Sequence, residues 1–590
     1  MTGRPHRRGR GTRLRLLATV CAAAAGLAAC TGVPASSAPE TIQPVPRVNQ
    51  QPAGFTPRTG EAPRQIVNDF LHDNSVDPRQ HSAARLYLTA AARNRWTDTT
   101  ATIISDERVG TYQVTKNQVV VTGRIVGKLD ADGVYTPYLQ AAGGTNQGGQ
   151  AVFVFGLQRV HGEYRISDPT RGLLLTADQF EQSYRPKPLY FFDLSNRYLV
   201  PDQRWSALQG VPLEEWLVGE LANGPSDLLQ SAVNSDTMPA QANTSHFVVS
   251  GGNPTKIEIP GAGQLEGAAR NRLAAQVGTT LNDVLPGETF VITDGGRPVP
   301  IPASGSPEFA ESSFGRAQGP APPTADVYYL RGGRIVKDGL PIPGRVNNGA
   351  YFFTSVALTR ITPTSPLTVA AVADGHQLLV GSQFGGLVKT AVHGELSRPA
   401  WAPGWGEVWI GDGDKIYRVL AAHPDRQPLE VPLPPEDVGA GRVVALQLSA
   451  EGTRLAVIIE GANGSRRLYV GAVTRSGGKV RVDTLDQVSP LGVSVDDVDW
   501  IEPLALVAIG EHRGDARIFT VNVDGSMWTE TSVSGLPARP NYVTVTPGQQ
   551  VWVSVGSGAS STVWEQENTE TWQSPGPVGQ TPGTAPQYLE

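Results

Sequence analysis

The 590-residue sequence has only two cysteines, Cys21 and Cys30, and none in the 560 residues that follow. Without further cysteines the folded part of the chain cannot be held by disulfides and cannot build a cysteine-containing zinc site. Histidine is also sparse, and none of the histidines forms the HExxH pair of a metalloprotease. The composition therefore excludes disulfide scaffolds and the common zinc motifs.

Positive charge is scarce once the first residues are set aside. The formal net charge is −6, and residues 1–29 hold six arginines and no carboxylate, so removing them gives −6 − 6 = −12. An acidic chain binds nucleic acid and anionic lipid poorly, and we expect no nucleic-acid partner. Lysine is rare as well, with 8 lysines against 41 arginines, a ratio typical of a GC-rich genome.

The apolar run near the start is too short to cross a membrane. Residues 16–29 are fourteen uncharged, mostly apolar residues, whereas a spanning helix needs about 20. A basic leader, a short apolar core and small residues at its end are typical of an export signal.

The end of this leader resembles the bacterial lipobox, in the residues Leu27, Ala28, Ala29 and Cys30. The resemblance implies cleavage between Ala29 and Cys30, and diacylglyceryl and N-acyl groups on Cys30. Stable anchoring takes two or more acyl chains, which this modification supplies. The sequence predicts a signal peptide over 1–29 and a lipid-anchored protein on the extracytoplasmic face of the cell membrane. An ordinary secretory leader with a chance cysteine is the alternative.

Residues 30–60 contain six prolines and no periodic apolar pattern, which predicts a lipidated cysteine followed by an extended spacer. From residue 61 helical patterns begin: Ile66, Val67, Phe70 and Leu71 share one face, and Ala84, Tyr87, Leu88 and Ala91 another. β-rich segments follow. Two helices leading into a curved antiparallel sheet resemble the NTF2-like fold, so 61–187 is predicted to be an α+β domain of that kind.

The segment 188–302 has a β-α-β-β-α-β pattern. One helix carries Leu213, Trp216, Leu217 and Leu221 and ends at "NGP"; a later one repeats apolar residues every four positions, and the segment closes on a "DGG" hairpin. The succession resembles the GerMN domain of bacterial envelope proteins. Residues 303–325, rich in glycine, serine and proline, are predicted to be a linker.

Residues 326–573 read as all-β. Five segments of similar form can be aligned on Val372, Trp401, Leu448, Trp500 and Val545, which stand 29, 47, 52 and 45 residues apart. Most of these steps approach the period of a four-stranded propeller blade, roughly 40–50 residues, which predicts a β-propeller of roughly five or six blades. An array of β-sandwiches is the alternative. The last segment, 574–590, is predicted to be a disordered tail.

No motif in the sequence forms a catalytic set. The histidines after the leader are scattered, and we interpret them as solvated or core residues: His72, His81, His161, His246, His376, His393, His423 and His512. "GDGD" at 411–414 lacks the other positions of a calcium loop and indicates a tight turn. Asp496, Asp497 and Asp499 could bind calcium or act as paired acids, but a loop of solvated charges is the favoured interpretation. The sequence predicts no metal site, no cofactor and no enzyme activity.

The order of parts as a whole is similar to that of the actinobacterial lipoprotein LpqB family. This resemblance implies an accessory protein of the MtrA–MtrB two-component system, which contacts the extracytoplasmic sensor domain of the histidine kinase MtrB and affects cell-wall homeostasis and division. A binding protein for peptidoglycan or another glycan is the second hypothesis, because Trp401, Trp405 and Trp409 cluster around one turn and could stack on sugars. A propeller hydrolase with carboxylates from separate blades is the third.

Overall fold

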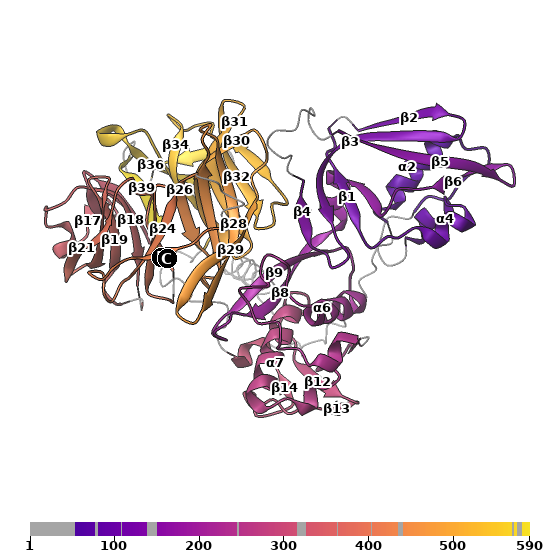
Figure 1. The fold of residues 1–590 in the computed structure, drawn as a ribbon, viewed down its shortest axis with the longest axis horizontal. Helices are drawn as coiled ribbons and strands as arrows, with labels where there is room; N and C mark the ends of the chain where they lie inside the picture. Colours follow the sequence, from indigo (N-terminus) through magenta and orange to yellow (C-terminus); the bar gives the residue numbers. More distant parts are fainter. Residues whose placement is uncertain are drawn as a thin grey trace, which may run out of the picture. The chain divides into compact units, whose positions relative to one another are not determined.

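The computed structural model describes residues 54–76, 81–107, 109–138, 150–244, 247–314, 326–360, 362, 364–402, 404–434, 441–568, 571–574 and 581–589 (Figure 1). Leu27, Ala28, Ala29 and Cys30 lie outside the described residues, as does His246. Within the described residues no helix is both long and apolar enough to cross a membrane.

The first region combines short helices with a curved sheet. The helices are α2 (Pro63–Asp73), α3 (Ser82–Leu86), α4 (Ala90–Arg95) and α5 (Ala177–Ser183). The strands are β1 (Ala101–Ile104), β2 (Gly110–Thr115), β3 (Gln118–Leu129), β4 (Tyr135–Pro137), β5 (Gln150–Val160), β6 (Glu163–Asp168) and β7 (Leu173–Thr176), in the order β6-β5-β3-β1-β7 with β2 and β4 also paired to β3. The pair β1–β7 is parallel and the others are antiparallel, so the expected all-antiparallel sheet is corrected at one edge.

The predicted helix after residue 81 is broken in two. Helix α3 stops at Leu86 because the backbone at Tyr87 and Thr89 exchanges hydrogen bonds with Ile166 of β6, and Thr89 then caps α4 by accepting a bond from the N–H of Ala92. This backbone pairing replaces one helical turn. The predicted face of α2 is confirmed, since Ile66, Val67 and Phe70 are buried in the core of this region.

The predicted spacer is too long at its end. The N–H of Phe55 donates to Asp73 over 3.1 Å, and the Phe55 ring lies 4.4 Å from that of His72. The N–H of Gly60 donates to Glu163 over 2.7 Å. Residues 54–60 are therefore held on the first region by one aromatic contact and by backbone hydrogen bonds.

The second region begins with a two-stranded ribbon and continues with helices around a small sheet. Its elements are β8 (Arg185–Phe192), β9 (Leu199–Ser206), α6 (Val211–Asn223), η3 (Ala240–Thr244), β10 (Val248–Ser250), β11 (Thr255–Glu258), η4 (Ala262–Gln264), α7 (Gly267–Asn282), β12 (Phe290–Asp294), β13 (Arg297–Pro298), β14 (Glu308–Phe309) and η5 (Glu311–Phe314). The sheet order is β10-β11-β12-β13, with β14 also paired to β12. The predicted hairpin is present, because Gly295 and Gly296 take φ angles of 60° and 73° between the paired residues Asp294 and Arg297.

The linker prediction for 303–325 is wrong over its first half. Strand β14 pairs with β12, and the Phe309 side chain is only 2% exposed and lies 5.9 Å from the Phe290 ring. A single aromatic residue in a segment of otherwise loop-like composition brings this stretch into the core of the second region. Residues 315–325 lie outside the described part of the chain.

The third region is built from six antiparallel sheets, counted over the described residues between 327 and 588. The first three sheets contain β15 (Val327–Arg331), β16 (Arg334–Lys337) and β17 (Leu340–Pro341) with β39 (Thr584–Tyr588); β18 (Phe353–Thr359), β19 (Thr368–Ala373), β20 (Gln377–Ser382) and β21 (Gly386–His393); and β22 (Ala400–Ala402), β23 (Glu407–Asp412), β24 (Lys415–Leu420) and β25 (Leu429–Val431). The short helices η6 (Arg345–Asn347) and η7 (Gly558–Ser560) lie in connections.

The other three sheets continue in the same way along the chain. They contain β26 (Arg442–Leu448), β27 (Arg454–Glu460), β28 (Arg466–Ser476) and β29 (Lys479–Gln487); β30 (Val493–Glu502), β31 (Ala505–His512), β32 (Asp515–Asn522) and β33 (Thr529–Ser532); and β34 (Pro540–Val545), β35 (Val551–Val555), β36 (Thr562–Asn568) and β37 (Thr571–Gln573) with β38 (Thr581–Pro582). In each of these three sheets, the strand that comes first in the chain (β26, β30 or β34) is the one that contacts the inner strands of the neighbouring sheets.

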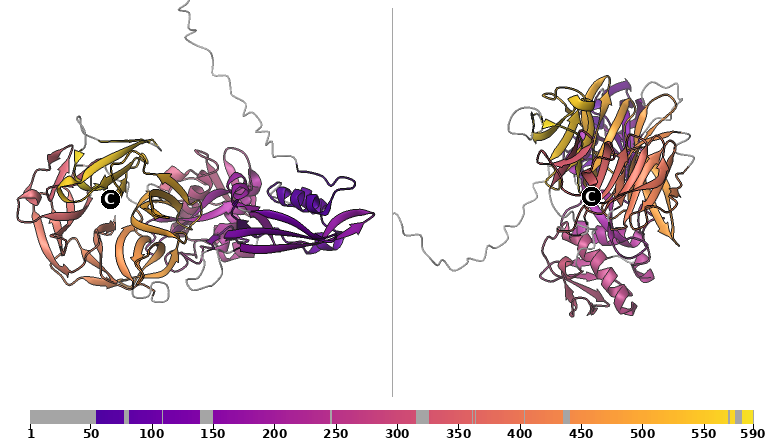
Figure 2. Two further views of the ribbon diagram at one scale, coloured as in Figure 1. Left: turned by 90° about the horizontal axis from the view of Figure 1, so that it is seen from above. Right: turned by 90° about the vertical axis from the view of Figure 1, so that its left-hand side faces the viewer.

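The innermost strands form a closed cycle. Each of β18, β22, β26, β30 and β34 contacts the next, and β39 contacts both β34 and β18. In Figure 2, left, the sheets coloured from salmon to yellow surround a common centre. Sheets arranged radially in a closed ring define a β-propeller, which excludes the sandwich array.

The predicted disordered tail is wrong for residues 581–589, because they close this ring. Strand β39 pairs with β15, which lies about 250 residues earlier, and Leu589 is fully buried beside Leu358. Residues 575–580 are outside the described part. The irregular first period has a separate cause: Val372 is on β19, the second strand of its sheet, whereas the other four alignment positions are on first strands.

Candidate functional site

A cavity of about 770 Å³ opens at one end of the propeller, where the innermost strands begin. Its walls come from β18, β26, β30 and β34, from the segment 396–398 that precedes β22, and from the ends of β27, β28 and β31. Concave sites at the axis of a ring of sheets collect side chains from many blades, and the volume falls within the range of ligand pockets, about 300–1,000 Å³. We call this cavity the funnel.

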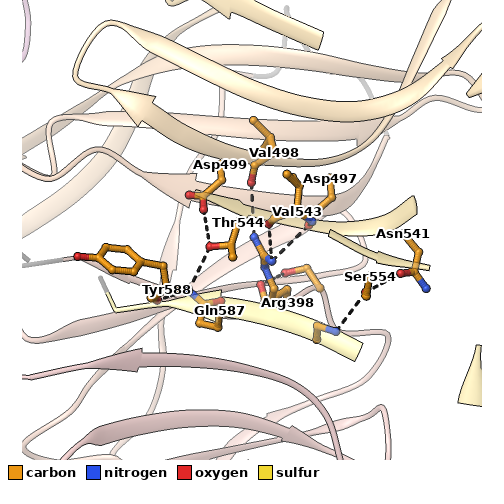
Figure 3. A network of polar contacts seen from close by, with 12 residues as sticks. Arg398, Asp497, Val498, Asp499, Asn541, Val543, Thr544, Ser554, Gln587 and Tyr588 are labelled. Atoms are coloured by element: carbon orange, nitrogen blue, oxygen red, sulfur yellow. Dashed lines mark hydrogen bonds and ion pairs between the residues drawn. The ribbon is translucent and has the colours of Figure 1, made fainter. Parts of the chain in front are cut away.

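Arg398 lines the funnel and reaches two neighbouring strands. It is 6% exposed, its guanidinium forms an ion pair of 3.2 Å with Asp497 on β30, and it donates to the carbonyl of Val543 on β34 over 3.2 Å (Figure 3). A second carboxylate nearby, that of Asp499, accepts a hydrogen bond of 2.8 Å from the hydroxyl of Thr544. One arginine thus links a loop and two strands that are about 100 and 145 residues away in sequence.

The network extends to the closing strand. The N–H of Tyr588 on β39 donates to the Thr544 hydroxyl over 3.1 Å, and the N–H of Ala585 donates to Ser554 over 3.3 Å. Because these bonds lie between β34, β35 and β39, the polar centre also fastens the last strand of the ring (Figure 3).

Two carboxylates share this centre with a single arginine side chain. Burial raises the pKa of Asp497 to about 6, against the lowering effect of Arg398 and of the Val543 N–H. Burial also raises the pKa of Asp499, with Arg398 and Thr544 acting in the opposite direction. Arg398 is therefore the cation that opposes the upward shift in the pKa of both carboxyl groups.

The rim of the funnel carries a chain of ion pairs from three sheets. Arg466 on β28 contacts Glu460 over 2.6 Å and Asp496 over 2.9 Å. Arg539, just before β34, contacts the same Asp496 and also Glu511 on β31. The Arg539 and Glu511 side chains are 43% and 37% exposed. Arg539 and Glu511 therefore place charges of both signs where the ion-pair chain of the funnel wall meets solvent.

The favoured interpretation of the three aspartates as a loop of solvated charges is wrong. They lie on β30, the innermost strand of its sheet, and Asp497 is 3% exposed. Asp497 and Asp499 are two residues apart and face the same side of the strand. There Asp497 pairs with Arg398, and Asp499 accepts a hydrogen bond from Thr544. No pattern in the local sequence reveals these partners, since they come from other sheets.

The calcium and metal interpretations gain no support from the geometry. Over the described residues, no three histidine, cysteine, aspartate or glutamate side chains are grouped so that they could hold a metal ion. The "GDGD" segment is the tight turn between β23 and β24, as predicted. The described histidines do not gather: His72 pairs with Asp73 and His512 with Glu530, on separate regions.

The tryptophan cluster does not form a sugar-stacking surface. Trp401 and Trp409 are 2% and 0% exposed and belong to hydrophobic cores of the propeller. Trp405 is half-buried, its ring is covered by the guanidinium of Arg475 at 4.3 Å, and its N–H donates to the carbonyl of Glu451. All three tryptophans support the fold, which removes the residues on which the glycan hypothesis rested.

The fold and the funnel define a β-propeller protein whose propeller is preceded in the sequence by two α+β regions. Comparison with known families agrees with this class of protein and narrows it to one family. The model "Lipoprotein LpqB, N-terminal domain" matches residues 56–181, and "Lipoprotein LpqB beta-propeller domain" matches residues 335–588. Together they cover more than half of the chain, and the chain belongs to the LpqB lipoprotein family.

Curated relatives match nearly the whole length. Lipoprotein LpqB of Nocardia farcinica is 28% identical over 574 residues, 91% of each chain. That of Rhodococcus jostii is 28% identical over 567 residues, 88% of each chain. That of Mycobacterium bovis is 27% identical over 588 residues, 94% of this chain and 97% of the relative.

Proposed function

We propose that this protein is a lipid-anchored binding protein on the extracytoplasmic face of the cell membrane. It regulates the MtrA–MtrB two-component system by contacting the extracytoplasmic domain of the histidine kinase MtrB, and thereby affects cell-wall homeostasis and division. Membership of a lipoprotein family supports the anchor and the envelope location. Cys30, with its diacylglyceryl and N-acyl groups, is the proposed point of attachment.

The observation that carries a binding role is the chemistry of the funnel. Asp496 and Glu511 accept hydrogen bonds from Arg539, and Glu460 accepts one from Arg466. Carboxylates that accept charge-assisted hydrogen bonds from arginine side chains suit recognition rather than proton transfer. We therefore propose a binding protein without catalytic residues, metal or cofactor.

The finer assignment of the domains belongs to the same proposal. The first region, with helices on a curved sheet, is proposed to be NTF2-like, and the second region to be GerMN-like. Each of the six sheets counts as one propeller blade, which gives six blades. The first blade along the chain is completed by a strand from the C-terminal segment, β39.

Tethering makes a modest affinity sufficient, because confinement to the membrane of the kinase raises the effective concentration without a new contact. We expect Cys30→Ala protein that is exported but not anchored to lose signalling at native expression. The measurement is MtrA phosphorylation in cells, with membrane and released fractions quantified for the variant. Full signalling by protein shown to be released would remove the tether from the mechanism.

Direct binding is the central test. We expect the mature chain from residue 30, carrying Cys30→Ser so that it bears no lipid, to bind the purified extracytoplasmic domain of MtrB saturably in calorimetry. A sensor domain from an unrelated kinase serves as the control. The partner would be refuted by two results together: no heat and no shift in analytical ultracentrifugation at high micromolar protein, and no association between the lipidated wild-type chain and full-length MtrB in one vesicle membrane.

A further inference from the structure

The innermost propeller strands share an irregularity at one end. In β18, β26, β30 and β34 the pairing to the next strand skips one residue, which leaves one extra residue on the inner strand. The extra residues are Thr354, Val444, Asp496 and Asn541. A β-bulge disrupts the ladder locally and re-aims a side chain, and such bulges concentrate next to functional sites.

Strand β22, the other inner strand between β18 and β34, has the same irregularity. Upstream of β22, Leu396 bridges Asp412 whereas Ala400 pairs with Trp409, so four steps on the inner strand face three on its partner. Five consecutive inner strands therefore carry a bulge at this end, and β30 has a second irregularity near its other end, between Trp500 and Glu502. Such repetition across irregular repeats of different sequence indicates a feature of the site rather than a local accident.

All five bulges line the funnel. Thr354, Val444, Asp496 and Asn541 belong to its wall, and so do Ser397 and Arg398 in the bulged segment before β22. The bulges turn these residues toward the cavity at the point where each ladder loses a regular pair. The funnel is thus a built site, with one position contributed by each of five neighbouring sheets.

The walls of the funnel differ in character. One side carries the ion-pair chain with Arg466, Asp496 and Arg539, whereas the other side presents the hydroxyl-bearing residues Thr354, Ser355 and Ser397. Three arginines and four carboxylates line the cavity in all: Arg398, Arg466, Arg539, Glu460, Asp496, Asp497 and Glu511. Charges of both signs in near balance give no preference for a phosphate or for a cation.

The aromatic content of the wall argues against a sugar. Among the lining residues Tyr542 is the one aromatic side chain, whereas rings with exposed faces are what sugar stacking requires. An extended polypeptide offers alternating N–H and C=O groups together with side chains of either charge. The hydroxyl groups and the charges of both signs in the wall are complementary to such a segment.

We propose that the funnel receives a short, extended polypeptide segment of a partner protein, one that carries both acidic and basic side chains. The cavity of about 770 Å³ holds a segment rather than a folded domain. The proposal rests on the proposed function only for the identity of the partner. Arg539 and Glu511, at the exposed rim, are the first charges that the entering segment meets.

The test uses the mature chain with Arg539→Ala or Glu511→Gln, titrated with the MtrB extracytoplasmic domain. Either change is expected to weaken binding by about tenfold or more, because a charged partner loses its counterpart. Arg517→Ala is the matched control: Arg517, on β32, makes an ion pair of 3.0 Å with Asp515 and does not line the funnel, and we expect a change within about twofold. Thermal melting verifies that each variant is folded.

The outcomes separate the two proposals. If the wild-type chain binds the sensor domain and both rim variants bind equally well, the funnel assignment is overturned while the proposed partner stands. If the wild-type chain does not bind it, a display library of random nonapeptides replaces the sensor domain. Peptides enriched on the wild-type chain should then lose affinity for Arg539→Ala, and no enrichment, or enrichment that ignores the rim, overturns the assignment.

A glycan occupant is the competing outcome. Wild-type chain and Arg539→Ala protein are each pelleted with purified sacculi. Co-sedimentation that disappears in Arg539→Ala would assign the funnel to the wall and overturn the peptide proposal. Equal recovery of both proteins in the supernatant supports it.

Discussion

A chain that ends at residue 573, before the segment that completes the ring, is expected to lose the stable fold of its propeller. Strand β39 supplies the innermost strand of the first sheet, and Ala585, Gln587 and Leu589 are each no more than 1% exposed. The truncation exposes β15 and the flanks of two neighbouring blades. We expect the free energy of unfolding of the propeller to fall by about 5 kcal/mol or more, which is comparable to the whole net stability of a domain.

Urea unfolding followed by tryptophan fluorescence measures this loss, and hydrogen exchange locates it. The amides of β15 should lose protection first, because their partners on β39 are gone. A chain that lacks only Glu590 is the control. Equal urea midpoints for the chain ending at residue 573 and for the control would contradict the role of β39 in closure.

Replacement of Arg398 by methionine is expected to destabilise the protein in a pH-dependent way. The substitution leaves the buried Asp497 and the half-buried Asp499 without their cation. Breaking a buried ion pair from one side costs about 3–5 kcal/mol. We expect a loss of this size at pH 7.5, measured as the free energy of unfolding in urea.

The sign of the pH dependence follows from the direction of the pKa shifts. The folded-state pKa of Asp497 is about 6, above its usual value of 3.8, so the folded chain binds this proton more tightly than the unfolded chain. The resulting contribution to stability is complete below pH 3.8 and is lost as the pH rises through about 6. Without Arg398 the pKa of both carboxyl groups rises further, and the loss caused by the mutation should therefore be smaller at pH 5 than at pH 7.5.

Arg517→Met provides the comparison for this pH series, since its ion pair with Asp515 lies at an exposed position on β32. We expect a change within about 0.5 kcal/mol at both pH values. A loss for Arg398→Met that is the same at pH 5 and pH 7.5 would show that packing, rather than the unpaired carboxylates, sets the cost.

The sequence predicts elements well where an apolar pattern decides them locally. The buried face of α2, the hairpin at Gly295 and Gly296, and the "GDGD" turn are confirmed because side-chain spacing or glycine conformation is sufficient to specify them. The propeller can also be predicted from the sequence, since its strands repeat at a period that only a few architectures share. The predicted helix through residue 87 fails because pairing with Ile166, from a distant strand, competes with the helical turn.

The candidate site was not predictable for a related reason. Asp496 is the bulged residue of β30, so the alternation of the strand slips by one at the position where the aspartates stand. Their partners are Arg398, Arg539 and Thr544, which belong to other parts of the chain. A single sequence shows order along the chain, whereas this site is defined by residues that meet around an axis.

The pairing of β15 with β39 also sets the order of events in folding. The two strands are separated by about 250 residues, and contacts at such separations form slowly because a long loop must first be closed. Until residues 584–588 arrive, β15 has an open edge that can pair with other chains. We therefore expect closure of the ring by β39 to be the final step in forming the propeller. Any product interrupted before residue 581 keeps that edge exposed, and we expect envelope proteases to degrade it in preference to the finished ring.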